Sequence, residues 1–204
     1  METFLFALFG YLIGSIPVAY LLVRKKHGAD LRQSGSRNIG ARNAFEVTGN
    51  KRLGFTVLSL DMLKGIIPLI ILDNLGYCEM ISIIAVTIIL GHCYPLWLKF
   101  HGGRGLATGA AIALLTAPQI LLCWLIIYFL SGVLKKQVHL QALSATLGCI
   151  IFELAVYGSQ IFSNFRFLCI GSELILHYCL LAILLIITSR HIQPVYELVQ
   201  KKKT

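Results

Sequence analysis

The chain has 204 residues, of which 57% are hydrophobic and only 13% are charged, and its mean hydropathy is +0.78. A soluble domain is about half apolar and a quarter charged, so this composition excludes an ordinary soluble protein. The net charge of +9 at pH 7 indicates that cationic side chains are available for anionic partners or for orienting the chain in a membrane.

Apolar runs of about 20 residues recur along the chain and predict membrane-spanning helices. They cover roughly residues 2–23, 54–72, 79–98, 138–158 and 165–189. At 1.5 Å per residue, each can cross a hydrocarbon layer of about 30 Å. The first run lacks a basic flank and an A-x-A-like cleavage site, so we interpret it as a retained span rather than a signal peptide. We expect a single integral membrane domain over residues 1–204.

Residues 106–134 fit either one long span or two short ones broken at Ala117-Pro118. With the basic loop 24–52 in the cytoplasm, one span would leave Lys135-Lys136 and Lys201–Lys203 outside, whereas two spans bring both clusters inside. Proline also disfavours helix in the residue before it. We therefore expect an all-α polytopic membrane protein with about seven segments, an external N-terminus and a cytoplasmic C-terminus. The first of the two short segments is about 18 Å long and is expected to be a half-span buried in protein.

The first polar motif is SGSRNIGARN, residues 34–43. It lies within residues 24–52, which hold eight of the 18 Lys and Arg residues. Glycine backbone can approach an anion closely, and arginine gives phosphate two parallel donors. The motif therefore predicts an anion site formed by Gly35, Ser36, Arg37, Asn38, Gly40, Arg42 and Asn43. The alternative is a flexible loop whose charge only sets topology. The spacing matches neither a Walker loop nor GxGxxG, so no nucleotide or nucleic-acid partner is expected.

The second polar motif is FHGGRGLATG, residues 100–109. If a helix begins near Leu106, then Gly102, Gly103 and Gly105 lie just before its N-terminus. Backbone donors and the positive end of the helix dipole would then face an anion, with Arg104 beside it. The alternative is a tight turn with a topology-setting arginine.

Ionisable residues also occur inside the predicted spans. Asp61 and Lys64 in DMLKG are three residues apart, so they lie on one helical face. Such a pair is either functional or a structural ion pair. Glu153 and Glu173 have no obvious partner in the sequence.

The remaining candidates are weaker. Ser144 and His191 are placed on the cytoplasmic side by the predicted topology, although ordinary surface polarity explains them as well. The six cysteines show no CxxC pair, and we expect them to pack as small apolar side chains rather than as disulfides. The nine acidic residues form no cluster in any loop, so no metal cofactor is expected.

Five motifs, in this order and spacing, together resemble the bacterial acyl-phosphate:glycerol-3-phosphate acyltransferases, the PlsY family. They are GSIPVAYLL (14–22), DLRQSGSRNIGARN (30–43), DMLKG (61–65), LGHCYP (90–95) and FHGGRGLATG (100–109).

The resemblance implies seven membrane segments with short cytoplasmic active-site loops. It also implies acyl transfer from acyl phosphate to the sn-1 hydroxyl of glycerol 3-phosphate in the bacterial inner membrane, without a cofactor. The partners it implies are these two substrates, membrane lipid and an acyl-phosphate-producing enzyme. On this basis the catalytic candidates are Ser36, Arg104 and His191, and the substrate-binding candidates are the loop residues already named, together with Ser144.

The chain departs from the family pattern at several site positions. Arg37 replaces a glycine, Arg104 replaces a lysine, Glu46 replaces an arginine and Pro194 replaces an asparagine. Arg37 and Arg42 are expected to restore the charge that Glu46 removes. The alternatives are a paralogue with another phosphate-bearing substrate, a non-catalytic paralogue, or a membrane-embedded anion-binding protein or transporter.

Overall fold

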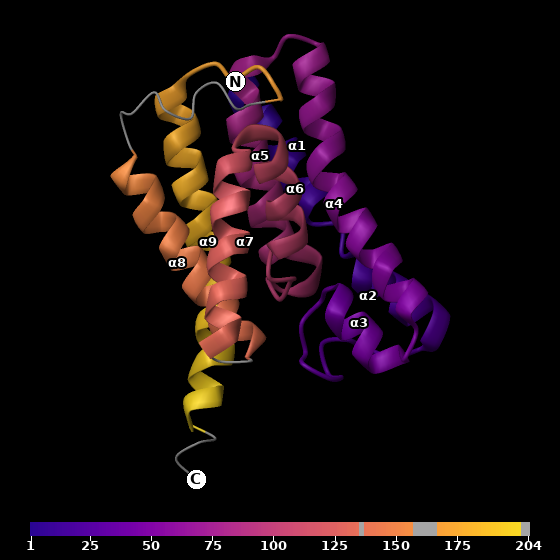
Figure 1. Ribbon diagram of the computed structural model, residues 1–204. Helices are drawn as coiled ribbons and strands as arrows, with labels where there is room; N and C mark the ends of the chain where they lie inside the picture. Colours follow the sequence, from indigo (N-terminus) through magenta and orange to yellow (C-terminus); the bar gives the residue numbers. More distant parts are fainter. Residues whose placement is uncertain (135–136, 157–166, 201–204) are drawn as a thin grey trace.

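The computed structural model describes residues 1–134, 137–156 and 167–200, and the described residues form helices and loops without a strand (Figure 1). The α-helices are α1 (Glu2–Gly14), α2 (Val18–His27), α3 (Ala41–Thr48), α4 (Lys51–Asn74), α5 (Cys78–Cys93), α6 (Leu106–Thr116), α7 (Pro118–Leu134), α8 (Val138–Ala155) and α9 (Glu173–Gln200), with a 3-10 turn at Leu96–Leu98.

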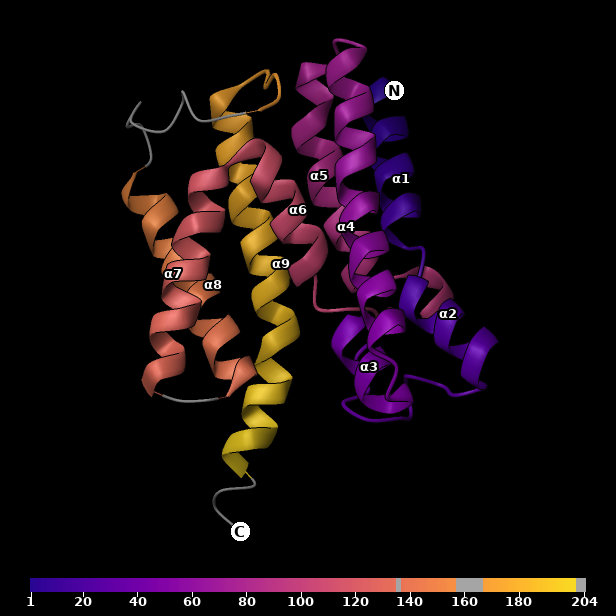
Figure 2. The ribbon, with the colours of Figure 1, turned by 45° about the vertical axis from the view of Figure 1, so that its right-hand side comes forward.

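Two groups of helices lie side by side and are joined through the middle of the molecule. α1 and α4 pack on α5 in one group, and α7 and α9 pack on α8 in the other, while α6 contacts α4, α5 and α7 (Figure 2). The largest buried cluster contains Leu69, Ile88, Ile112 and Ile187, which come from α4, α5, α6 and α9. This apolar core fixes α6, and with it the loop that precedes α6, against both groups.

Five segments of the described chain are long and apolar enough to cross a membrane, and α6 and α7 are shorter apolar helices. The predicted break at Ala117-Pro118 is confirmed, because α6 ends at Thr116 and Pro118 begins α7. Proline fits the first position of a helix, where its missing N–H is not needed. The chain is therefore a multi-pass helical membrane protein. Met1 lies at one end of the bundle and the last turn of α9 at the other (Figure 1). Lys135-Lys136 and Lys201–Lys203, used in the charge argument, lie outside the described residues.

The first apolar run is a broken helix rather than a continuous one. α1 ends at Gly14, and α2 begins after Ser15, Ile16 and Pro17. A carbonyl left free by such a break needs a partner inside an apolar bundle. The Ile16 carbonyl has two partners: the Val18 N–H donates to it at 3.0 Å and Lys64 Nζ donates to it at 3.3 Å.

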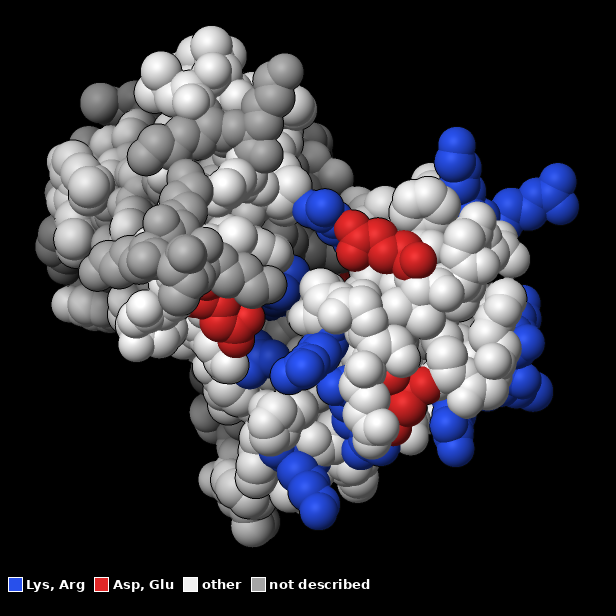
Figure 3. All heavy atoms as spheres, turned by 90° about the horizontal axis from the view of Figure 1, so that it is seen from below, with Lys and Arg blue, Asp and Glu red and all other residues white. Residues whose placement is uncertain are grey.

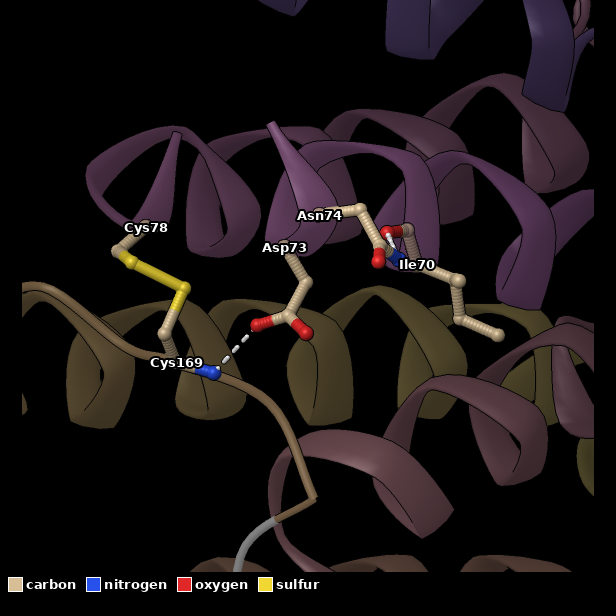
Figure 4. Close-up of a disulfide and its surroundings, with 5 residues drawn as sticks. All are labelled: Ile70, Asp73, Asn74, Cys78 and Cys169. Carbon is tan, nitrogen blue, oxygen red and sulfur yellow. Dashed lines mark hydrogen bonds between the residues drawn. A yellow bond between two sulfur atoms is a disulfide. The ribbon is translucent and has the colours of Figure 1, made fainter. Parts of the chain in front are cut away.

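The expectation that all six cysteines pack as apolar side chains is wrong for two of them. Cys78, at the start of α5, forms a disulfide with Cys169, in the segment before α9 (Figure 4). The Asp73 carboxylate accepts a hydrogen bond of 2.7 Å from the Cys169 backbone N–H in the same place. The two cysteines are 91 residues apart, so no local spacing announces the pair. Cys93, Cys123, Cys149 and Cys179 are free.

One intramembrane acid that lacked a partner in the sequence has one in the fold. The Glu153 carboxylate on α8 lies 2.8 Å from His177 Nδ1 on α9. A buried carboxylate of this kind is tolerated because a hydrogen-bonded partner compensates it.

Candidate active site

The described basic and glycine-containing segments gather at one end of the bundle. The C-terminal end of α2, the loop to α3 and the lower half of α9 all lie there (Figure 2). Seen from below, Lys and Arg side chains follow the boundary between two lobes and the rim of one of them (Figure 3). This end is the part of the described chain with the charge for an anionic ligand.

Asn43 organises the SGSRN loop from a fully buried position in α3. Its amide nitrogen lies within hydrogen-bond distance of the carbonyls of Leu31, Ser34 and Asn38, at 3.4, 3.1 and 2.8 Å. Its Oδ1 atom accepts from the Ser36 backbone N–H at 2.9 Å. Asn43 therefore holds the loop in shape, and this leaves the exposed Ser36 side chain at the surface.

The loop turns through two residues with left-handed backbone. Gly35 has φ +59°, and Arg37 has φ +57°. Glycine adopts this conformation freely, whereas other residues do so rarely. The position of Arg37 is the one where the resembled family has glycine, so the backbone shape is kept although the side chain is different. Gly40 precedes α3, and a Cβ there would crowd the Asn38 amide.

Arg42 does not act as an unpaired cation in this structure. Its Nε atom lies 2.7 Å from Glu46 Oε1, one helical turn away in α3. Both side chains are exposed, so the pair contributes little to stability. The charge that Arg42 adds to the loop is nevertheless partly neutralised by Glu46.

Gly102 and Gly103 are close-approach residues whose N–H groups are already used. Gly102 N–H donates to the Cys93 carbonyl at 3.1 Å, and Gly103 N–H donates to the His92 carbonyl at 3.0 Å. A Cβ on Gly102 would collide with the same two carbonyls, and one on Gly103 would collide with the His92 ring. The two glycines thus seat the loop on the end of α5 instead of offering their own amides to a ligand.

Further backbone donors come just after these two glycines, in the first turn of α6. Gly105 has φ +80° and is the N-cap of α6, so the first-turn amides and the positive end of this helix lie beside Arg104. Burial, together with the nearby cations Arg190 and Arg42, lowers the pKa of the Arg104 guanidinium to about 10. A half-buried cation with cationic neighbours favours an anion as ligand.

Sequence reasoning missed two residues that complete this cluster. Arg190 on α9 donates to the carbonyls of Gly102 and Gly103, and its guanidinium lies 5.2 Å from the centroid of the Tyr94 ring. His139, at the start of α8, has its ring 6.3 Å from that of His191. Contacts between distant segments of the chain bring both residues to the cluster, although Arg190 directly precedes the predicted His191 in the sequence.

The predicted residues His191 on α9 and Ser144 on α8 differ in burial. His191 is buried, with Nδ1 2.9 Å from the Ile187 carbonyl, and it interacts electrostatically with Arg104 and Arg190. Nδ1 therefore carries the proton in this contact, and Nε2 is left as an acceptor. Ser144 is exposed on α8, where His139 and not Ser144 meets His191.

A buried polar network supports the glycine loop from inside. Asp61 Oδ1 lies 2.8 Å from Lys64 Nζ and 3.6 Å from His92 Nδ1. The Thr108 hydroxyl of α6 donates to the Asp61 carbonyl at 2.8 Å. The network connects α4, α5 and α6 directly beneath Gly103. The predicted Asp61–Lys64 pair therefore has a structural role. Among the described residues, no group of three or more His, Cys, Asp and Glu side chains could hold a metal ion.

An apolar cavity of about 100 Å³ runs between α6, α7 and α9 beside this polar cluster. Leu106, Ile187, Ile120 and Trp124 are among its lining residues. A Cβ on Gly105 would lie 3.1 Å from Ile187, so the cavity begins next to the N-cap of α6. The site therefore has a cationic end and an apolar compartment in direct succession.

Known proteins are similar to this chain in sequence and in fold. Residues 4–201 match the family model described as glycerol-3-phosphate acyltransferase. A glycerol-3-phosphate acyltransferase of Myxococcus xanthus is 41% identical over 140 residues, which are 68% of this chain and 72% of the relative. One of Staphylococcus carnosus is 38% identical over 166 residues, 77% of this chain and 82% of the relative.

Two solved structures of PlsY, an integral membrane glycerol 3-phosphate acyltransferase, also resemble the chain. The glycerol 3-phosphate form superimposes with a TM-score of 0.77 and 28% identity, covering 98% of this chain and 94% of that one. The lysophosphatidic acid form gives 0.75 and 25% identity, covering 98% and 93%. The chain therefore belongs to the glycerol-3-phosphate acyltransferase family.

Proposed function

We propose that this chain transfers the acyl group of acyl phosphate to the sn-1 hydroxyl of glycerol 3-phosphate, which gives lysophosphatidic acid for phospholipid synthesis. An ester bond forms between the hydroxyl oxygen and the acyl carbon. The bond between that carbon and the phosphate oxygen breaks, inorganic phosphate leaves, and the hydroxyl hydrogen is released as a proton.

The observation that carries the proposal is the meeting of two environments at the start of α6. Arg104 and the N-terminus of α6 offer positive charge, and the cavity between α6, α7 and α9 begins at the next turn. Acyl phosphate has this same composition, an anionic head on an apolar chain. Because the acyl group is already activated, the protein needs mainly to position and polarise it.

The proposed roles follow from the geometry. Arg104 stabilises charge on the phosphate or on the acyl oxygen. His191 presents Nε2 as an acceptor for the attacking hydroxyl. Ser36 and Asn38 lie on the loop that Asn43 shapes, and we assign them to the second phosphate-bearing substrate. Gly102, Gly103 and Gly105 contribute because they have no side chain, which lets the loop backbone lie close to α5 and α9.

A turnover assay tests the proposal. Purified protein in detergent receives palmitoyl phosphate and glycerol 3-phosphate, and inorganic phosphate and lysophosphatidic acid are measured together. We expect both products in equal amounts, and neither when one substrate is omitted. Product formed only from an acyl thioester would overturn the choice of donor. Product formed only with another phosphate-bearing alcohol would indicate a substrate-shifted paralogue. Binding without turnover would indicate a non-catalytic protein, and uptake into vesicles without a covalent product would indicate a transporter.

We also propose that the site faces the cytoplasm of a bacterial inner membrane, with the N-terminus outside. An enzyme that makes acyl phosphate would supply the donor from that side or from within the membrane. A reporter fused after Thr204 is expected to be active only in the cytoplasm. External activity would contradict both the orientation and the count of seven segments.

A further inference from the structure

Arg190 makes an unusual contact for a basic residue next to a candidate anion site, because its donors reach the chain's own backbone. Nε lies 3.2 Å from the Gly103 carbonyl and Nη2 lies 3.0 Å from the Gly102 carbonyl. The planar fork of arginine suits two neighbouring acceptors, which an ammonium group cannot engage in the same way. The contact joins α9 to a loop that lies 87 and 88 residues earlier.

The same two glycines are held from the opposite side by α5. Their N–H groups donate to the carbonyls of Cys93 and His92, at 3.1 and 3.0 Å. Both the donor and the acceptor of each glycine are thus engaged, one by α5 and the other by Arg190. The position of this loop is therefore determined jointly by two helices that belong to different groups in the bundle.

The hydrogen bond from Arg190 to the Gly103 carbonyl also orients the N–H of the next residue, Arg104. In a trans peptide the carbonyl of one residue and the N–H of the following residue point in opposite directions. Fixing the Gly103 carbonyl toward Arg190 therefore directs the Arg104 N–H away from Arg190. The next residue, Gly105, has φ +80° and is the N-cap of α6. The direction of the Arg104 N–H, just before this helix start, thus depends on Arg190.

Arg190 is itself positioned by aromatic and hydroxyl groups. Its guanidinium lies 5.2 Å from the Tyr94 ring centroid, within the range of a cation–π contact. The Tyr94 hydroxyl lies 2.6 Å from the Ser189 hydroxyl, and the Tyr11 hydroxyl donates to the Tyr94 carbonyl at 2.8 Å. These contacts leave the arginine fork aimed at the glycine loop.

We propose that Arg190 is a positioning residue for acyl transfer, which acts by fixing the peptide between Gly103 and Arg104 so that its N–H faces the anion at the start of α6. The inference rests on the proposed function. The competing explanation is that Arg190 acts through its charge on a substrate phosphate. The two explanations differ in whether lysine, which keeps the charge without the fork, can replace arginine.

Kinetics with Arg190→Lys and Arg190→Ala separate these explanations. Misplacing a catalytic donor by about 1 Å costs up to roughly 100-fold in rate, so we expect kcat to fall about 10- to 100-fold in both variants. The KM for glycerol 3-phosphate should change by less than about threefold, since binding of the second phosphate does not need this peptide. Ethylguanidinium added to Arg190→Ala should restore part of kcat, and ethylammonium should not. Arg52→Lys and Arg52→Ala, at an exposed position on the same end, serve as matched controls.

Three results would overturn the inference: near-normal kcat in Arg190→Lys, a loss confined to KM, or equal rescue by the two cations. Amide hydrogen exchange over residues 102–108, with and without inorganic phosphate, gives a readout that needs no turnover. Phosphate should slow exchange in the unsubstituted protein and in Arg52→Lys, but not in Arg190→Lys. If the unsubstituted protein shows no turnover, the proposed function fails, and the exchange experiment alone decides for or against Arg190. Equal protection in all three proteins would then reject it.

Discussion

The two ends of the helix bundle are held together by different chemistry. At the end that carries Met1, the Cys78–Cys169 disulfide and the Asp73 carboxylate fasten α4, α5 and the segment before α9. At the other end, hydrogen bonds from Arg190 and Asn43 hold two glycine-containing loops in place. A covalent link fixes one geometry, whereas hydrogen bonds to loop carbonyls also orient donors toward a ligand.

The comparison teaches that framework and site are separate in this fold. Changes in the two glycine-containing loops should alter activity more than folding, and changes at the disulfide end should do the reverse. The buried Asp61–Lys64 pair lies between the two ends and contacts both the break before α2 and the His92 ring. The following predictions test the separation, in order of their expected effect on activity.

Arg104→Ala is expected to have the largest effect. Loss of a positioned charge donor costs roughly 2–4 kcal/mol of transition-state stabilisation, or about 10²- to 10³-fold in kcat/KM. Arg104→Lys should keep most of the activity at pH 7, because the site retains its cation and resembles one built around lysine. The measurement is kcat/KM for both substrates in correctly inserted protein. Equal activity for Arg, Lys and Ala would remove Arg104 from the site and assign it to topology alone.

Asn43→Leu should lower kcat/KM by roughly 10- to 100-fold, because loop misplacement of this kind weakens catalysis strongly. The variant keeps a similar volume but leaves the Ser36 N–H and the loop carbonyls without their buried partner. Unsatisfied buried groups cost about 1–3 kcal/mol each, so some loss of stability is also expected.

Asn50→Ala provides the control for the Asn43 experiment. Asn50 is the N-cap of α4 at the same end, and its side chain accepts from the Leu53 N–H at 3.1 Å. Its loss should cost about 1 kcal/mol of stability with little change in kcat/KM. If Asn50→Ala lost as much activity as Asn43→Leu, general destabilisation of this end would explain both.

The pH dependence of Arg104→Lys gives a smaller effect that sharpens the first prediction. Burial lowers the pKa of Arg104 to about 10, so the group stays cationic through pH 9. Lysine starts from about 10.4 instead of 12.5 or above, and the same burial should bring it into the range of pH 8–9. As pH rises through that range, Arg104→Lys should lose activity about tenfold while the unsubstituted protein changes little. Parallel pH profiles would show that the side chain at 104 does not meet the substrate as a cation.

Local sequence pattern was sufficient for the features that depend on neighbouring residues. The break at Ala117-Pro118 follows from proline geometry, and the contact of Asp61 with Lys64 follows from their i,i+3 spacing. These features require no knowledge of tertiary packing.

The missed features depend on contacts across the fold. The Gly102 and Gly103 amides face α5 because the loop folds back on the helix it has just left. Arg190 reaches this loop from α9, and Cys169 reaches Cys78 from a segment 91 residues away. Neither contact leaves a periodic or spaced pattern in the sequence. In Arg190 the signal was present as a basic residue beside His191, but the positive-inside rule explained it equally well.

The smallest effect on activity is expected at the disulfide end. Closing a loop of 91 residues restricts the unfolded chain, and removing such a link typically costs about 2–4 kcal/mol. Cys78→Ser and Cys169→Ser should therefore shorten the half-life of activity at elevated temperature in detergent, while kcat/KM at 25 °C stays within about twofold. Cys179→Ser, which removes a free thiol, should change neither quantity. Reductant should shorten the half-life of the unsubstituted protein and leave that of Cys78→Ser unchanged.

If Cys78→Ser instead lost activity well below its unfolding temperature, the disulfide end would be coupled to the site through α5, whose last carbonyls hold Gly102 and Gly103. That outcome would replace two separate ends with one continuous framework.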